Sequence, residues 1–156
     1  MPVQRERDDR GRARNARPRD ALGRPLPRDA EGVPRVPDEL VLPPVPSLVE
    51  AQRLLDAGMP FHAHEVLEAT WKAAPPQERE LWQGLAQLAV GYTHLLRGNP
   101  TGARTLLQRA RRRVTLYADS PPYGIDVAGL LVWADAVLNS LETTGDATAE
   151  PPRLQV

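Results

Sequence analysis

The sequence contains no cysteine and almost no lysine: Lys72 is the single lysine among 156 residues. Without cysteine the chain forms no disulfide, has no thiolate nucleophile and cannot build a cysteine-bound zinc site, whereas histidine and carboxylate sites stay open. The preference for arginine accompanies abundant alanine, proline and glycine, which is typical of a GC-rich genome. We therefore attach no functional meaning to that preference.

Neither an excess of charge nor a long apolar run is present. Lys and Arg together number 20, as do Asp and Glu, so the net charge is zero and no overall field draws the chain to nucleic acid or an anionic membrane. No stretch approaches the roughly 18 apolar residues of a membrane span. The charged N-terminus lacks the apolar core of a secretory signal. These features predict a cytoplasmic protein without membrane association.

The chain has room for one ordinary domain. Residues 1–46 hold nine prolines, ten arginines and eight acidic residues, and their apolar residues follow no period. Such a segment cannot bury enough surface to offset the entropy of ordering, so we predict a disordered Arg/Pro-rich tail that is either a solvated extension or a docking segment. The folded domain is expected at 47–142, followed by a frayed tail at 143–156.

Helical periodicity and the positions of proline and glycine predict an all-α fold. Ser47 and Glu50 have the spacing of a capping box. Gly98 suits a left-handed helix end, and Asn99 before Pro100 suits the start of the next helix. Nothing alternates as a strand would, and short loops favour a compact bundle of about five antiparallel helices. The expected helices are 47–57, 61–73, 77–97, 100–117 and 126–141.

Polar side chains fall on helix faces that are expected to be buried. In the second helix, at about 100° per residue, the face predicted to be inside comprises Phe61, His64, Leu67, Glu68 and Trp71. Glu65 lies at the border of this face, and His62 is expected to be exposed. Buried polar groups left unpaired cost about 1–3 kcal/mol each, so they must find partners.

The third helix adds a second set of such residues. It has no charged residue from Leu81 through Leu96, which is typical of a central helix packed on several sides. On the side away from its leucines, Gln83, Gln87 and His94 form a polar stripe. We infer that the two helices face each other across one polar cluster. Its members are His64, Glu65, Glu68, Gln83, Gln87 and His94.

Three interpretations of this cluster stay open. It is a structural hydrogen-bond network that sets the register of two helices, a pocket for a small molecule or anion, or a metal site. In the pocket interpretation Glu65 or Glu68 is a general base, although the sequence discloses no reaction. A divalent metal, which we do not favour, would use His64, Glu68 and His94. The HExxE pattern matches neither the HExxH of zinc proteases nor the Glu-x-x-His of di-iron bundles.

Two other functions are considered. As a scaffold or adaptor, the chain would act through contacts with a protein partner or a second copy, with Trp82 and Trp133 in the core or at such a contact. As a nucleic-acid binder, which is less favoured, it would use the arginines of the fourth helix. These arginines are Arg104, Arg109, Arg111, Arg112 and Arg113.

Four stretches also resemble a known family. These are Phe61-His-Ala-His-Glu-Val-Leu-Glu-Ala-Thr-Trp71 and Trp82-Gln-Gly-Leu-Ala-Gln-Leu-Ala-Val-Gly-Tyr-Thr-His94, followed by Arg97-Gly-Asn-Pro-Thr-Gly-Ala103 and Tyr123-Gly-Ile-Asp126. Over residues 47–141 the chain is similar to the bacterial and archaeal "domain of unknown function 309" family. The resemblance implies a compact all-α fold and no established activity. It implies signature positions at His64, Glu65, Glu68, Trp71, Gln83, Gly84, Gln87 and His94.

Overall fold

The structure, a computed structural model, describes residues 41–156. Its regular elements are α1 (Pro44–Asp56), α2 (Pro60–Ala73), the 3-10 helix η1 (Pro76–Glu78), α3 (Arg79–Leu96), α4 (Pro100–Thr115) and α5 (Val127–Thr144). Within this range the only β pairing is an isolated bridge between Ile125 and Gln155. The predicted all-α fold is therefore confirmed, whereas the disorder predicted for residues 1–40 lies outside the described residues. No helix in the described range is long and apolar enough to cross a bilayer.

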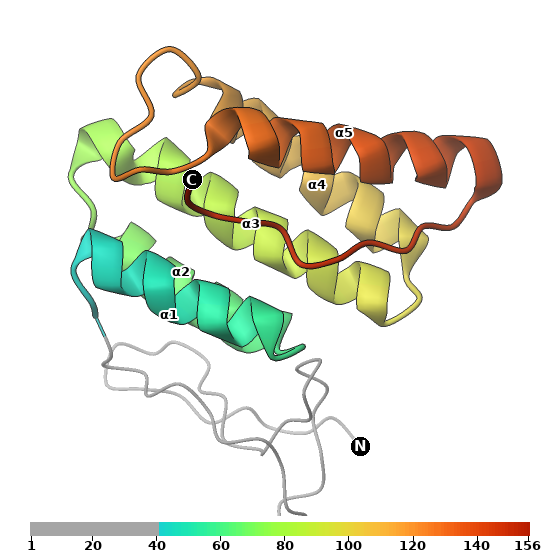
Figure 1. The fold of residues 1–156 in the computed structure, drawn as a ribbon, viewed down its shortest axis with the longest axis horizontal. Helices are drawn as coiled ribbons and strands as arrows, with labels where there is room; N and C mark the ends of the chain where they lie inside the picture. The colour runs from blue at the N-terminus through green and yellow to red at the C-terminus, as the bar shows by residue number, and fades with distance from the viewer. Residues whose placement is uncertain (1–40) are drawn as a thin grey trace, which may run out of the picture.

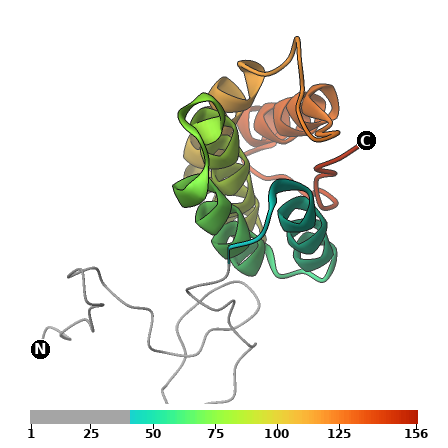
Figure 2. The same cartoon turned by 90° about the vertical axis from the view of Figure 1, so that its left-hand side faces the viewer.

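Helix α3 lies at the centre of the fold. It packs along both α2 and α4, while α1 packs on α2 and α5 packs on α4. Consecutive helices run antiparallel (Figure 1), as the short connections predicted. Helices α1 and α5 lie on the same side of α3, and the end of the chain passes between them (Figures 1 and 2).

Two glycines let α3 and α4 approach each other closely. A Cβ atom on Gly91 would lie 2.7 Å from Cδ2 of Leu107, and one on Gly84 would lie 3.0 Å from Cγ2 of Val114. Both glycines are buried. The seven-residue spacing places them two turns apart on one side of α3, so this side is the α4 contact.

The predicted junction between α3 and α4 is confirmed in detail. Gly98 adopts φ 75°, a left-handed conformation that glycine tolerates without strain. The Asn99 side chain accepts a hydrogen bond of 3.1 Å from the amide of Gly102, and Pro100 is the first residue of α4. Asparagine at this position satisfies one of the free amides of the first turn. The junction fixes where His94, near the end of α3, meets α4.

The start of α1 differs from the predicted capping box. The helix begins at Pro44, and no side chain caps its first turn. Ser47 is buried, and its Oγ lies 2.6 Å from Oγ1 of Thr70 on α2. Prolines are favoured in a first turn because they have no amide hydrogen to satisfy there. The serine is thus an interhelical contact, and residues 44–46, expected in the tail, belong to the helix.

The C-terminal segment, residues 146–156, is ordered, whereas the sequence predicted a frayed tail. It runs back across the molecule as an extended chain after α5 ends at Thr144 (Figure 1). The side chain of Leu154 is fully buried. The amide of Asp126 donates to the carbonyl of Leu154 at 2.9 Å, and the amide of Val156 donates to the carbonyl of Gly124 at 2.9 Å. These contacts order a segment that has no helical periodicity of its own.

Candidate functional site

The buried face of α2 is rotated from the predicted one. His62, expected to be exposed, is 1% exposed, whereas the side chain of His64, expected inside, is 20% exposed. The buried residues of α2 are Pro60, His62, Ala63, Val66, Leu67 and Thr70. The prediction gave most weight to the large side chains of Phe61 and Trp71. The buried residues instead include the small Ala63 and Thr70, and Thr70 contacts Ser47 of α1.

His64 and Glu68 form a pair on the surface of α2. The Nε2 atom of His64 lies 3.2 Å from Oε2 of Glu68, and Nζ of Lys72 lies 3.4 Å from Oε1 of the same carboxylate. The hydrogen bond from His64 lowers the pKa of Glu68 to about 2, against the opposing effect of burial. Glu68 is therefore ionised at neutral pH. Glu65, on the same helix, is half-buried.

The predicted polar stripe of α3 is half-exposed. Gln83, Gln87, Val90 and His94 are all partly exposed, and we call these four residues the α3 stripe. Their spacings of four, three and four residues place them in one line along the helix. Gln87 accepts a hydrogen bond of 3.0 Å from Nε of Arg113 on α4, and Arg113 also binds Glu80 at 2.5 Å. The stripe therefore borders α4.

His94 lies at the junction between α3 and α4. Its Nδ1 atom is 3.2 Å from Nδ2 of Asn99, the residue that caps α4. The ring also packs against Gly102, where an added Cβ would lie 2.9 Å from His94 Cγ. Burial, with a smaller effect of the Arg97 charge, lowers the pKa of His94 below its usual value. His94 is therefore neutral at pH 7, so the α3 stripe carries no charge.

The predicted residues are divided among separate contacts. His64 binds Glu68 within α2, Gln87 binds Arg113 of α4, and His94 contacts Asn99 beside α4. None of these three contacts joins α2 to α3, as one interior network would. Among residues 41–156, no three His, Asp or Glu side chains come together as metal ligands would. The metal set considered from the sequence, His64 with Glu68 and His94, is therefore not assembled in this structure.

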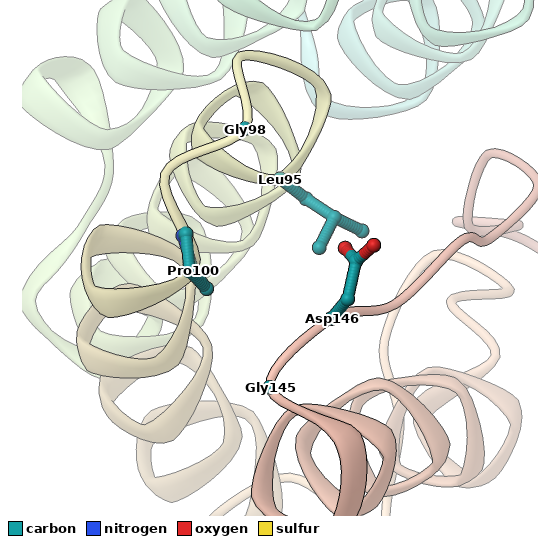
Figure 3. A pocket seen from close by; sticks show the side chains of 5 residues that line it. All are labelled: Leu95, Gly98, Pro100, Gly145 and Asp146. Carbon is teal, nitrogen blue, oxygen red and sulfur yellow. The ribbon is translucent and has the colours of Figure 1, made fainter.

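A hollow of about 370 Å³ lies elsewhere, between the α3–α4 junction and the end of α5 (Figure 3). Its lining consists of Leu95, Gly98, Pro100, Gly145 and Asp146. None of the residues expected to bind a ligand is among them. Asp146 supplies the single charged side chain of this lining, so the hollow offers few polar groups that could orient a small molecule.

The arginines of α4 largely bind acceptors within the protein. Arg111 pairs with Asp135 of α5 at 2.5 Å, and Arg104 donates to the carbonyl of Leu141 at 3.4 Å. Arg113 is held by Gln87 and Glu80. Arg109 and Arg112 are exposed. Arginines that bind α3 and α5 in this way are structural contacts, which weakens the case for a phosphate-binding face.

The sequence interpretation missed a group of residues that hold the C-terminal segment. Gln52 on α1, Tyr92 on α3 and Trp133 on α5 all bind its backbone. Trp82 is fully buried, as expected for a core residue, whereas Trp133 donates a hydrogen bond of 2.9 Å to the carbonyl of Glu150. Periodicity gave no signal for these contacts, because they join residues up to 102 positions apart.

Comparisons with known proteins address the family resemblance. Residues 48–106 match the family model DUF309, a domain of unknown function. The resemblance to the DUF309 family is thereby confirmed over these residues, whereas the Tyr123–Asp126 stretch lies beyond the match. The DUF309 match covers most of α1, all of α2 and α3 and the first part of α4, and so includes the His64–Glu68 pair and the α3 stripe. The C-terminal segment lies beyond it.

A bacterial relative shares sequence with about half of the chain. The chain is 35% identical over 85 residues to "Uncharacterized protein YpuF" of Bacillus subtilis (strain 168). The alignment covers 53% of this chain and 49% of that protein, so the chain spans about half the length of the relative it matches. No solved structure gives a significant match. The comparisons therefore supply a family match over residues 48–106 and no activity.

Proposed function

We propose that this DUF309 protein is an adaptor that binds a protein partner along the α3 stripe. The observation that carries the proposal is the absence of charge on this half-exposed helix face. Solvent-facing helix surfaces are normally rich in charged residues. Protein interfaces, by contrast, are depleted of charge at their centres. From Gln83 to His94, three turns of α3 offer only amide groups, a valine and a neutral imidazole to a partner.

The hydrogen-bonding groups of the stripe support direct recognition. The Gln83 side chain makes no hydrogen bond to the described residues, and the Gln87 side chain uses only its Oε1 atom, for Arg113. One whole amide and one NH2 group, on partly exposed side chains one helical turn apart, are therefore available to a partner. The spacing of four, three and four residues is also that of a coiled-coil seam, so the partner we propose is a helix lying along α3.

The residues of α2 provide a flanking contact in this proposal. Helix α2 packs on α3. Its row of His64, Glu65 and Glu68 is partly exposed, with Glu68 ionised. In the proposal this charged row of the neighbouring helix is the rim of the interface, and the uncharged stripe is its centre. In this arrangement the α2 row contributes to partner choice more than to affinity.

A small-molecule pocket has less support. Ligand sites are usually concave and bury most of a bound molecule. No residue of the α3 stripe lines the hollow at the α3–α4 junction. Of the predicted polar residues, Gln87 is bound by Arg113 of α4 and His64 is paired with Glu68 within α2. Catalysis at Glu65 or Glu68 would need a substrate held over these side chains. A protein partner lying across the surface needs no cavity.

Site-specific photo-crosslinking tests the adaptor proposal. A benzophenone side chain is placed at Gln83, on the stripe, or at Gln108, an exposed glutamine on α4 that serves as the control. Both chains are produced in the cells that express the protein naturally and are irradiated there. We expect a discrete adduct with another protein from position 83 and not from position 108. Equal adduct patterns from both positions, or none from position 83, would contradict the proposal.

A further inference from the structure

The C-terminal segment is bound as a peptide would be, mainly through its backbone. Gln52 donates from Nε2 to the carbonyl of Pro152 at 3.0 Å and accepts the amide of Leu154 at 2.8 Å. The side-chain amide of Gln52 thus hydrogen-bonds both a carbonyl and an amide of the segment backbone. Tyr92 donates to the carbonyl of Ala149 at 3.1 Å, and Trp133 to that of Glu150 at 2.9 Å.

The turn before α5 completes this recognition in the manner of a strand edge. The amide of Asp126 donates to the carbonyl of Leu154, and the amide of Val156 donates to the carbonyl of Gly124. Ile125 and Gln155 form an antiparallel bridge. Pairing of an extended peptide with an exposed backbone edge is a common mode of peptide binding. We call Gln52, Tyr92, Trp133 and residues 123–126 the segment site.

Only two side chains of the segment are buried. Pro152 and Leu154 are buried, while Arg153 between them is exposed and pairs with Asp56 at 3.2 Å. Backbone hydrogen bonds supply general affinity, and buried side chains at alternate positions supply specificity. The segment site therefore selects proline and leucine two residues apart in an extended chain. Asp56 adds a preference for a basic residue between them.

The connection to α5 allows the segment to leave its site. Gly145 follows α5 in a left-handed conformation, φ 77°, and residues 146–150 have no regular structure. The polar side chains of Thr148 and Glu150 are exposed. Leu154 is part of the hydrophobic core, so release of the segment about this irregular linker would remove its side chain from that core. The contacts that α3 makes with α2 and α4 do not involve the segment.

We propose that the segment site is a binding site for extended peptides that carry a Pro-x-Leu sequence. The chain's own C-terminal segment, with Pro152-Arg-Leu154, occupies this site in cis. A tethered ligand is present at an effective concentration on the order of millimolar, so an external peptide binds only when it displaces the segment. This inference concerns a different surface from the α3 stripe and stands independently of the adaptor proposal.

Peptide binding to the full-length chain tests the inference. The probe is a fluorescently labelled peptide of residues 146–156, and its anisotropy reports binding. Leu154→Asp in the full-length protein removes the buried anchor and opens the site. Val156→Asp places the same charge on a side chain that is 100% exposed, and it serves as the matched control.

The expected result is selective binding. The Leu154→Asp protein binds the labelled peptide about tenfold or more tightly than the wild type or Val156→Asp protein, because the competing tethered segment is weakened. A peptide with the same Leu154→Asp change does not bind, and adding Gln52→Ala to the opened protein abolishes the gain. Equal affinity of a helical Leu154→Asp protein and the wild type would overturn the inference.

Hydrogen exchange on the unaltered full-length chain provides a test that needs no variant. We expect the Leu154 amide, although bonded to Gln52, to exchange well before the amides in the middle of α3. Local release of the segment would explain this order, since an opening that leaves the helices packed needs less free energy than global unfolding. Exchange of Leu154 only together with α3 would show that the segment never leaves its site, and would overturn the inference even if Leu154→Asp did not fold.

Discussion

Replacing Leu154 by alanine measures how strongly the C-terminal segment is held. Leu154 is fully buried, although it lies two residues before the last residue of the sequence. Burying a leucine side chain contributes about 1.5–3 kcal/mol, and core Leu→Ala changes cost about 2–5 kcal/mol when a cavity remains. The segment can detach instead of leaving a cavity. The loss is therefore limited by the free energy of docking the segment, and we expect about 1.5–3 kcal/mol.

Two reference variants make this magnitude interpretable. Leu85 on α3 is also fully buried, but a central helix cannot detach, so Leu85→Ala should cost more, about 3–5 kcal/mol. Val156 is fully exposed, so Val156→Ala should change stability by less than about 0.5 kcal/mol. The assay is urea denaturation followed by tryptophan fluorescence. Trp133, which bonds the segment, and Trp82, in the core, both contribute to the signal.

The reasoning would be refuted if the loss of stability in Leu154→Ala did not lie between the losses in Val156→Ala and Leu85→Ala. A Leu154→Ala loss below about 0.5 kcal/mol would mean that the segment is not docked in solution. A loss equal to that of Leu85→Ala would mean that the segment is an inseparable part of the core. That second outcome would agree with simultaneous hydrogen exchange of Leu154 and α3.

Three further predictions concern the helices. Gly91→Ala should destabilise the fold by about 1–2 kcal/mol in urea denaturation, because the clash with Leu107 exceeds the gain in helix propensity of about 1 kcal/mol; a stabilised variant would contradict this packing. Asn99→Ala should cost about 1 kcal/mol by the same measurement, through loss of the α4 cap, and an unchanged midpoint would count against the cap. Glu68→Gln should cost about 0.5–1 kcal/mol at pH 7, a small value because the carboxylate is part-exposed. The pKa of Glu68 is lowered from 4.5 to about 2 in the folded protein, so this stabilisation is present above pH 4.5 and is lost as the pH falls toward 2; denaturation curves whose difference stays constant over that range would refute it.

Helix order and junctions could be predicted because their signals are local. Gly98, Asn99 and Pro100 each act on their own backbone, and all three do in the structure what the sequence predicted. Asp126 caps α5 through the amide of Gly129 in the same way. Ser47 was misassigned because a capping pattern and an interhelical contact look alike in one sequence. Its partner, Thr70, is 23 residues away.

The candidate site was predicted less well because it depends on which helix faces meet. Periodicity placed His64 inside α2 and His62 outside, and the structure reverses this order. Periodicity gives the angle between side chains, but it does not say which face of α2 meets α1 and α3. The stripe of Gln83, Gln87 and His94 was found correctly as one line. Its half-exposed position beside α4 could not be predicted without knowing how α3 and α4 pack.

The order of the C-terminal segment could not be predicted from the sequence. Its order depends on Gln52, Tyr92 and Trp133, which come from three helices far apart in the chain. An extended segment that contains two adjacent prolines carries neither a helical nor a strand period. Such a segment is ordered only by a site that the rest of the fold creates.

The yield of the Gln83 photo-adduct in a Gln87→Glu chain tests the central claim most directly. A glutamate at position 87 can still accept the hydrogen bond from Nε of Arg113, so the fold is retained while a negative charge enters the uncharged stripe. The account predicts that the adduct seen with the wild type falls about tenfold or more, because Glu80 and the new carboxylate would share the one guanidinium of Arg113 and leave a net negative charge at the interface centre. An undiminished adduct in a normally folded Gln87→Glu chain would contradict the claim that a partner binds along the α3 stripe.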